Sequence, residues 1–191
     1  MQNPWDVRPR SRSKDTTSEA VFVKVGEALT HWEMLESAMA ELFDAMVSSH
    51  PSNRAAFMAF VAVKSSSART ELLQAAFDRA IPLSSPARQE VGYLIESFGK
   101  FGARRNEIAH GRVYDLGEHG FALGPNNVMR HKWTPKGEAK YQYWSRDIEY
   151  YLRCFSTLRE GVDAACTGLR QLTASRTKRT KSRQSEKDKR T

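Results

Sequence analysis

The sequence is poor in cysteine and has no long apolar run. Its 191 residues include two cysteines, Cys154 and Cys166. Both lie in one expected helix about 18 Å apart, which is too far for a disulfide. We therefore expect a reduced, cytoplasmic protein. No run of about 18 apolar residues is present, so we expect no membrane span. The N-terminus also lacks the apolar region of a secretory signal.

Excess charge is missing from the central part of the chain. Residues 17–173 hold 18 basic and 18 acidic residues, whereas residues 174–191 hold eight basic and two acidic ones. We therefore expect a disordered basic N-terminal arm (1–17), a folded domain (18–173) and a disordered basic tail (174–191). Such a tail would add salt-dependent affinity for nucleic acid. A tail that only improves solubility is an equally open interpretation.

Apolar residues recur at helical spacing in four segments, at about residues 18–49, 53–80, 85–111 and 145–173. The second segment contains the stretch Lys64–Ser67 (KSSS), which predicts a break into two helices. Ser85 and Pro86 suit the start of the third helix, and Gly111 suits its C-cap. Glycine, proline and short β-type runs between residues 112 and 143 predict an irregular or β-hairpin excursion. The predicted fold is all-α, a four-helix up-down bundle with this excursion between the third and fourth helices.

A polar cluster, GARRNEIAHGRV, ends the third predicted helix at residues 102–113. On a helical wheel, Arg105 falls in the middle of the apolar face, whereas Arg104 falls outside it. A buried guanidinium needs an acceptor, and Glu36 falls on the buried face of the first helix. We therefore predict an Arg105–Glu36 ion pair that lines a polar pocket or a dimer seam. Its alternative role is to fix the register of two helices.

The stretch from Arg105 to His110 (RNEIAH) resembles the signature of the HEPN superfamily, in which an arginine is followed by a polar residue and then by a histidine. The segment HWEMLE at residues 31–36 is similar to small bacterial members. The resemblance implies metal-independent RNA cleavage at a composite site across a homodimer. It implies that His110 acts as general base or acid, that Arg105 stabilises phosphoryl charge, and that Asn106 orients the histidine or the phosphate. These roles suit imidazole and guanidinium chemistry.

The resemblance also bears on partners. Arg104 and Arg112 are candidate contacts to the RNA backbone. An antitoxin or another partner protein is a candidate binding partner, and we expect no cofactor. The residues His110, Asp115, His119 and His131 match no zinc spacing, so we expect no metal. A non-catalytic helical module that dimerises or binds a partner is the alternative to a ribonuclease of toxin or phage-defence type.

Overall fold

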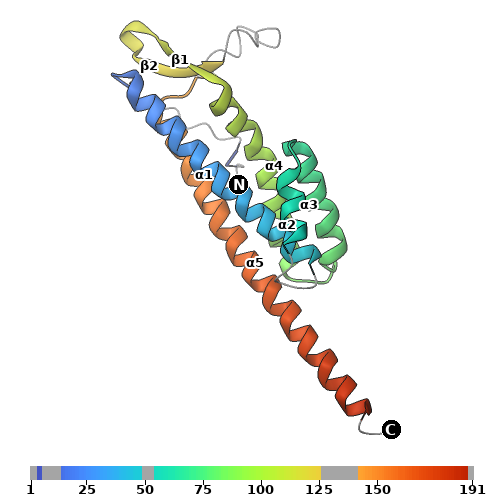
Figure 1. The fold of residues 1–191 in the computed structure, drawn as a ribbon. Coiled ribbons are helices and arrows are strands. Elements are labelled where there is room, and N and C mark those ends of the chain that lie inside the picture. Colours follow the sequence, from blue (N-terminus) through green and yellow to red (C-terminus); the bar gives the residue numbers. More distant parts are fainter. Residues whose placement is uncertain (1–3, 6–13, 49–53, 126–141, 189–191) are drawn as a thin grey trace. The chain divides into compact units, whose positions relative to one another are not determined.

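The structure is a computed structural model that describes residues 4–5, 14–48, 54–125 and 142–188. The described residues form mostly helix, with one two-stranded antiparallel sheet (Figure 1). The elements in chain order are α1 (Ser18–Val47), α2 (Ala55–Ala62), α3 (Ser66–Ala80), α4 (Ala87–His110), β1 (Gly111–Asp115), the 3-10 helix η1 (Gly117–His119), β2 (Phe121–Pro125) and α5 (Ser145–Asp188). Among the described residues, no helix has the length and apolarity needed to cross a membrane.

The predicted break in the second helical segment is confirmed, because α2 ends before the KSSS stretch and α3 begins within it. Ser65 has an extended backbone and caps α3, since its hydroxyl accepts a hydrogen bond from the Ala68 N–H at 3.4 Å. Arg69 of α3 reaches back and donates from Nε to the Val63 carbonyl at 2.7 Å. The two short helices are therefore tied together across the break.

Helix α4 ends at His110, so Gly111 takes the predicted C-cap position, but it is also the first residue of β1 and lacks the positive φ of a left-handed cap. The described residues with positive φ are Gly117 and Gly120. A Cβ atom on Gly111 would lie 2.6 Å from Cγ of Leu123 and 3.0 Å from the carbonyl oxygen of Glu107. Glycine is needed here because β2 packs directly against the end of α4.

The β-hairpin is joined by isolated bridges to two other segments of the chain, one before α1 and one just before α5. Phe121 of β2 pairs with Asp15, and Leu123 pairs with Tyr143. The carboxylate of Asp15 accepts hydrogen bonds from the backbone N–H and the hydroxyl of Ser145, at 2.7 and 2.5 Å. Asp15 therefore links the hairpin to the first residue of α5.

Two described segments lie within the arm and the tail that the sequence predicts to be disordered. Trp5 is 5% exposed and packs edge-on against Phe101, with ring centroids 5.8 Å apart. Tyr150 donates a hydrogen bond to the Pro4 carbonyl at 3.0 Å. At the other end, α5 continues to Asp188. Residues 171–188 contain no glycine or proline and many arginine, lysine and glutamine residues, which favour helix.

The chain divides into two compact units. The first unit contains Met1–Glu36 and Glu96–Arg159. Its core is aromatic: Trp32 stacks on Phe98 with ring centroids 5.1 Å apart, and Phe155 packs edge-on against Trp32 at 5.1 Å. Burial of these large rings removes much apolar surface from water, which stabilises the unit.

The second unit contains Ser37–Ile95 and Glu160–Thr191. Its core includes Phe43 and Phe60, whose ring centroids lie 5.2 Å apart. Glu41 of α1 pairs with Arg54 at 2.6 Å and with Arg170 of α5. The hydrogen bond from Arg54, with that from Arg170, lowers the pKa of Glu41 although burial opposes this. The carboxylate therefore ties α5 to the start of α2.

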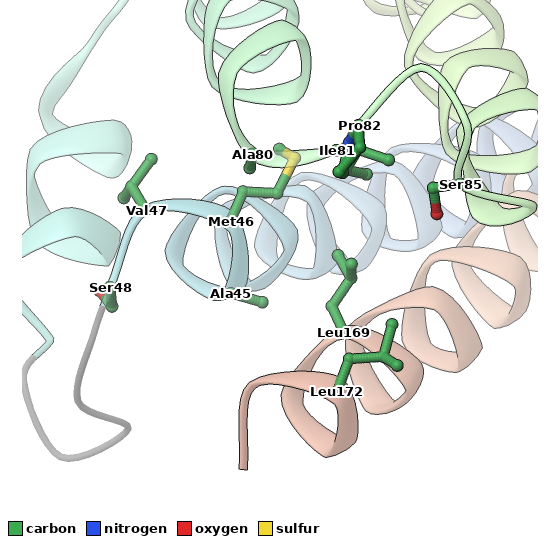
Figure 2. A pocket seen from close by; sticks show the side chains of 10 residues that line it. All are labelled: Ala45, Met46, Val47, Ser48, Ala80, Ile81, Pro82, Ser85, Leu169 and Leu172. Atoms are coloured by element: carbon green, nitrogen blue, oxygen red, sulfur yellow. The ribbon is translucent and has the colours of Figure 1, made fainter. Parts of the chain in front are cut away.

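An apolar pocket of about 300 Å³ lies in the second unit (Figure 2). Met46, Ile81, Leu169 and Leu172 form much of its wall. No lining residue is charged, and none belongs to the polar cluster at the end of α4. The pocket therefore shares no residue with the site that the sequence predicted.

Candidate functional site

The last two turns of α4 carry the three predicted catalytic residues. His110 is the final residue of α4, and both His110 and Asn106 are exposed. Four residues on a helix turn through about 400°, so these two side chains leave α4 on nearly the same side. Arg112 follows in β1 and is also exposed. An exposed imidazole beside an exposed amide is accessible to a ligand from solvent.

Arg105 is half-buried, and its guanidinium is turned toward the side of Asn106. The Nη1 atom donates to Oδ1 of Asn106 at 3.2 Å, and the Nη2 atom lies 3.3 Å from Oε1 of Glu33. The side chain of Arg105 is 28% exposed and that of Glu33 is 64% exposed. Arg105 is therefore joined to Asn106 by a hydrogen bond and to α1 by an exposed ion pair.

The structure corrects the partner predicted for Arg105. Its ion pair is formed with Glu33, one helical turn before the predicted Glu36. Glu36 accepts a hydrogen bond from Nε1 of Trp32 at 2.8 Å. The indole of Trp32 is fully buried, and a buried N–H requires an acceptor. The carboxylate of Glu36 supplies this acceptor for the aromatic core.

Arg104 is the more buried of the two arginines, contrary to the prediction from the helical wheel. Its Nη1 atom pairs with Oε1 of Glu107 at 2.6 Å, and the two side chains are 17% and 24% exposed. Tyr143, next to α5, donates a hydrogen bond from its hydroxyl to the other carboxylate oxygen of Glu107. Arg104, Glu107 and Tyr143 form a polar network that we call the Arg104 network. The sequence predicted that Arg104 contacts a phosphate of the RNA backbone, and such a phosphate would have to compete with Glu107.

The helical-wheel prediction for Arg104 and Arg105 was wrong because the buried face of α4 changes direction toward its C-terminus. Phe101 and Ile108 are 3% and 1% exposed, and Arg104 lies between them at spacings of three and four residues. The prediction extended the face defined by residues 91–101 in a straight line. A stripe with spacings of three and four drifts around a helix of 3.6 residues per turn, so the drift moved the buried position from Arg105 to Arg104.

The electrostatics of the Arg104 network favour a charged pair with neutral tyrosines. Burial acts to lower the pKa of Arg104, but the charge and hydrogen bond of Glu107 outweigh it and raise the pKa. Burial and the nearby Glu107 charge raise the pKa of Tyr143 well above its usual range. Burial also raises the pKa of Tyr151 to about 12. Both tyrosines therefore remain protonated donors at neutral pH.

Glu33 and Tyr143 were not predicted from the sequence to be part of this region. The ion pair of Arg104 with Glu107 had a local signal, because oppositely charged residues three apart on a helix are neighbours. Glu33 lies beside Glu36 in the same acidic segment of α1, so the choice between them depended on one helical turn. Tyr143 is 36 residues away from Glu107 in the chain. No local pattern connects those two residues.

The four residues whose spacing matches no zinc pattern are His110, Asp115, His119 and His131. Of these, His131 lies outside the described residues. Among the residues that the structure does describe, no group of three or more histidine, cysteine, aspartate or glutamate side chains is placed to hold a metal ion. The polar groups gathered at the end of α4 are instead guanidinium, amide, imidazole and carboxylate.

The chain was compared with protein-family models, curated proteins and solved structures, and none of them matches it.

Proposed function

We propose that the protein is a HEPN-like, metal-independent endoribonuclease of toxin or phage-defence type that acts in the cytoplasm. The observation that carries this proposal is the exposure of His110 and Asn106 on one side of α4, with Arg105 hydrogen-bonded to Asn106. Within the described residues, the side chain of His110 forms no hydrogen bond that would occupy it. The resemblance also implies a four-helix up-down bundle and a homodimer, and both belong to the proposal.

In the proposed reaction, His110 takes the proton of a ribose 2′-hydroxyl, and the 2′-oxygen attacks the adjacent phosphorus. The bond from phosphorus to the 5′-oxygen breaks, and that oxygen takes a proton from His110 of a second chain. Arg105 stabilises the charge on the phosphoryl oxygens, and Asn106 orients the phosphate or the imidazole. The products are a 2′,3′-cyclic phosphate and a 5′-hydroxyl.

The test is incubation of purified protein with mixed-sequence RNA in EDTA. Wild type is compared with His110→Ala and with His119→Ala, which removes an exposed histidine from η1. We expect cleavage by wild type and by His119→Ala, with 2′,3′-cyclic phosphate ends, and loss of cleavage by at least about 100-fold in His110→Ala. Equal cleavage by all three proteins, or by none, would refute the role of His110.

The alternative function is a non-catalytic helical module that dimerises or binds a partner such as an antitoxin. The observation in its favour is α2, which contains no charged residue and leaves Met58 and Val61 61% and 45% exposed. An apolar helix with exposed side chains is typical of an interaction surface. Under this alternative, Met58→Asp changes the assembly state measured by light scattering, and no variant changes RNA integrity.

A further inference from the structure

The ion pair between Glu33 and Arg105 has the features of a contact that a ligand can displace. One carboxylate oxygen faces one guanidinium nitrogen at 3.3 Å, beyond the usual length of a charge-assisted hydrogen bond. The side chain of Glu33 is 64% exposed, so its carboxylate is well hydrated when it leaves. The pair contrasts with Arg104–Glu107, which is short and mostly buried.

We propose that Glu33 occupies the position on Arg105 that an RNA phosphate takes when RNA binds. The proposal rests on the proposed function to the extent that RNA reaches Arg105. Carboxylates and phosphates both present oxygen acceptors to the terminal nitrogens of a guanidinium. RNA binding then exchanges one anion for another at Nη2, while the neutral Asn106 keeps its contact with Nη1. Glu33 therefore lowers the affinity of the site for RNA.

The neighbouring acidic residues of α1 are engaged elsewhere, which makes Glu33 specific for this role. Glu27 pairs with Lys24 of the same helix at 2.8 Å. Glu36 accepts the hydrogen bond from the buried indole of Trp32. Glu33 is the acidic residue of this group that faces Arg105, and it comes from a different helix. A change at Glu33 should therefore act on RNA through Arg105, whereas a change at Glu27 should not.

The experiment measures binding of a fluorescein-labelled, mixed-sequence, single-stranded RNA by anisotropy in EDTA. Every protein carries His110→Ala, so that the proposed cleavage does not consume the probe. Glu33→Gln and the matched control Glu27→Gln each remove one exposed negative charge from α1. Arg105→Ala and the combination of Arg105→Ala with Glu33→Gln complete a double-mutant cycle. Thermal unfolding confirms that each variant is folded.

We expect Glu33→Gln to bind RNA about two- to five-fold more tightly, the effect of removing a competing exposed ion pair. Glu27→Gln should have a clearly smaller effect, and the effect of Glu33→Gln should vanish when Arg105 is alanine.

Three results would overturn the inference: equal tightening by Glu33→Gln and Glu27→Gln, tightening by Glu33→Gln that persists without Arg105, or no binding of the RNA by any variant. The proposed function is tested separately by cleavage with wild-type His110. Binding that follows the expected cycle without any cleavage would remove the nuclease and keep the phosphate position at Arg105. Cleavage by wild type, together with RNA affinity that does not change when Glu33 is substituted, would keep the nuclease and remove the proposed phosphate position at Arg105.

Discussion

The ion pairs of the two adjacent arginines at the end of α4 are expected to contribute unequally to stability. Glu107→Gln keeps the shape of the side chain and removes its charge, which leaves Arg104 without its ionic partner. Glu33→Gln does the same to the pair of Arg105. The structure places the first pair mostly inside the protein, at 17% and 24% exposure, and the second largely at the surface, at 28% and 64%. The two substitutions form a matched comparison.

The expected magnitudes follow from burial. Removal of one partner from a fully buried ion pair costs about 3–5 kcal/mol, whereas an exposed pair contributes about 0–1 kcal/mol. Glu107→Gln should therefore lower the free energy of unfolding by about 2 kcal/mol, because the pair is partly solvated and Tyr143 still finds an oxygen acceptor. Glu33→Gln should lower it by less than about 1 kcal/mol. In a chain of this length the difference corresponds to several degrees in melting temperature.

The assay is urea denaturation followed by far-ultraviolet circular dichroism and by tryptophan fluorescence, with thermal melts as a second measurement. Two probes are needed because the chain contains two compact units, and agreement between the probes tests whether unfolding is a single transition. Tyr143→Phe serves as a control, because it leaves the ion pair of Arg104 intact and removes the hydrogen bond to Glu107. It should cost about 1 kcal/mol. If Glu33→Gln destabilises the protein as much as Glu107→Gln, Arg105 is the inward arginine and our assignment is wrong.

Three further predictions concern other parts of the chain. Gly111→Ala should destabilise by about 1–3 kcal/mol through overpacking, whereas Gly168→Ala, in a helix with open space around it, should stabilise by up to about 1 kcal/mol; equal effects in urea melts would contradict the close approach at Gly111. Glu41 has a lowered pKa, so its contribution to stability is present above its ordinary value of 4.5 and is lost as pH falls through the lowered value. The stability difference between wild type and Glu41→Gln should shrink between pH 6 and about pH 3, and a constant difference would show that the carboxylate charge is not responsible. Trp5→Ala should cost about 3 kcal/mol and expose the ring of Phe101, and an unchanged melting curve would place the tryptophan in solvent.

Much of the helical framework was predictable because its signals are local. The KSSS stretch interrupts the apolar pattern and supplies Ser65 as a cap, so it predicted the break between α2 and α3. The apolar spacing likewise predicted a helix from about residue 145, and α5 begins at Ser145, where the Asp147 carboxylate accepts a hydrogen bond from the N–H of Trp144 at 2.9 Å. Each of these features depends on residues within one or two helical turns. Such features are encoded in short segments and can be inferred from them.

The unpredicted features depend on contacts between distant segments. Asp15 and Ser145 are 130 residues apart, and no property of the arm around Asp15 indicates that it will bond to the start of α5. Trp5 lies in a stretch whose charge predicted disorder, but its ring packs in the aromatic core. The orientation of Arg104 required knowledge of which neighbour covers the last turns of α4. Apolar residues spaced three and four apart define the buried face of a helix only as long as its packing partner stays on the same side.

The different environments of Arg104 and Arg105 explain how one helix end can be both firmly held and available to a ligand. A binding group must be accessible, but the backbone that carries it must be fixed by contacts of its own. The Arg104 network supplies those contacts between α4 and Tyr143, which is itself hydrogen-bonded through both backbone groups to Leu123 of β2. Arg105 and His110 leave the same turns toward solvent.

Because holding the backbone and contacting the ligand fall to different side chains, Tyr143→Phe should loosen the site without removing any group that we propose to contact RNA. Its effect on cleavage should therefore appear mainly as a lower kcat, since looser positioning of His110 weakens the transition state more than the binding of RNA. A change confined to KM would argue that the Arg104 network contacts the RNA.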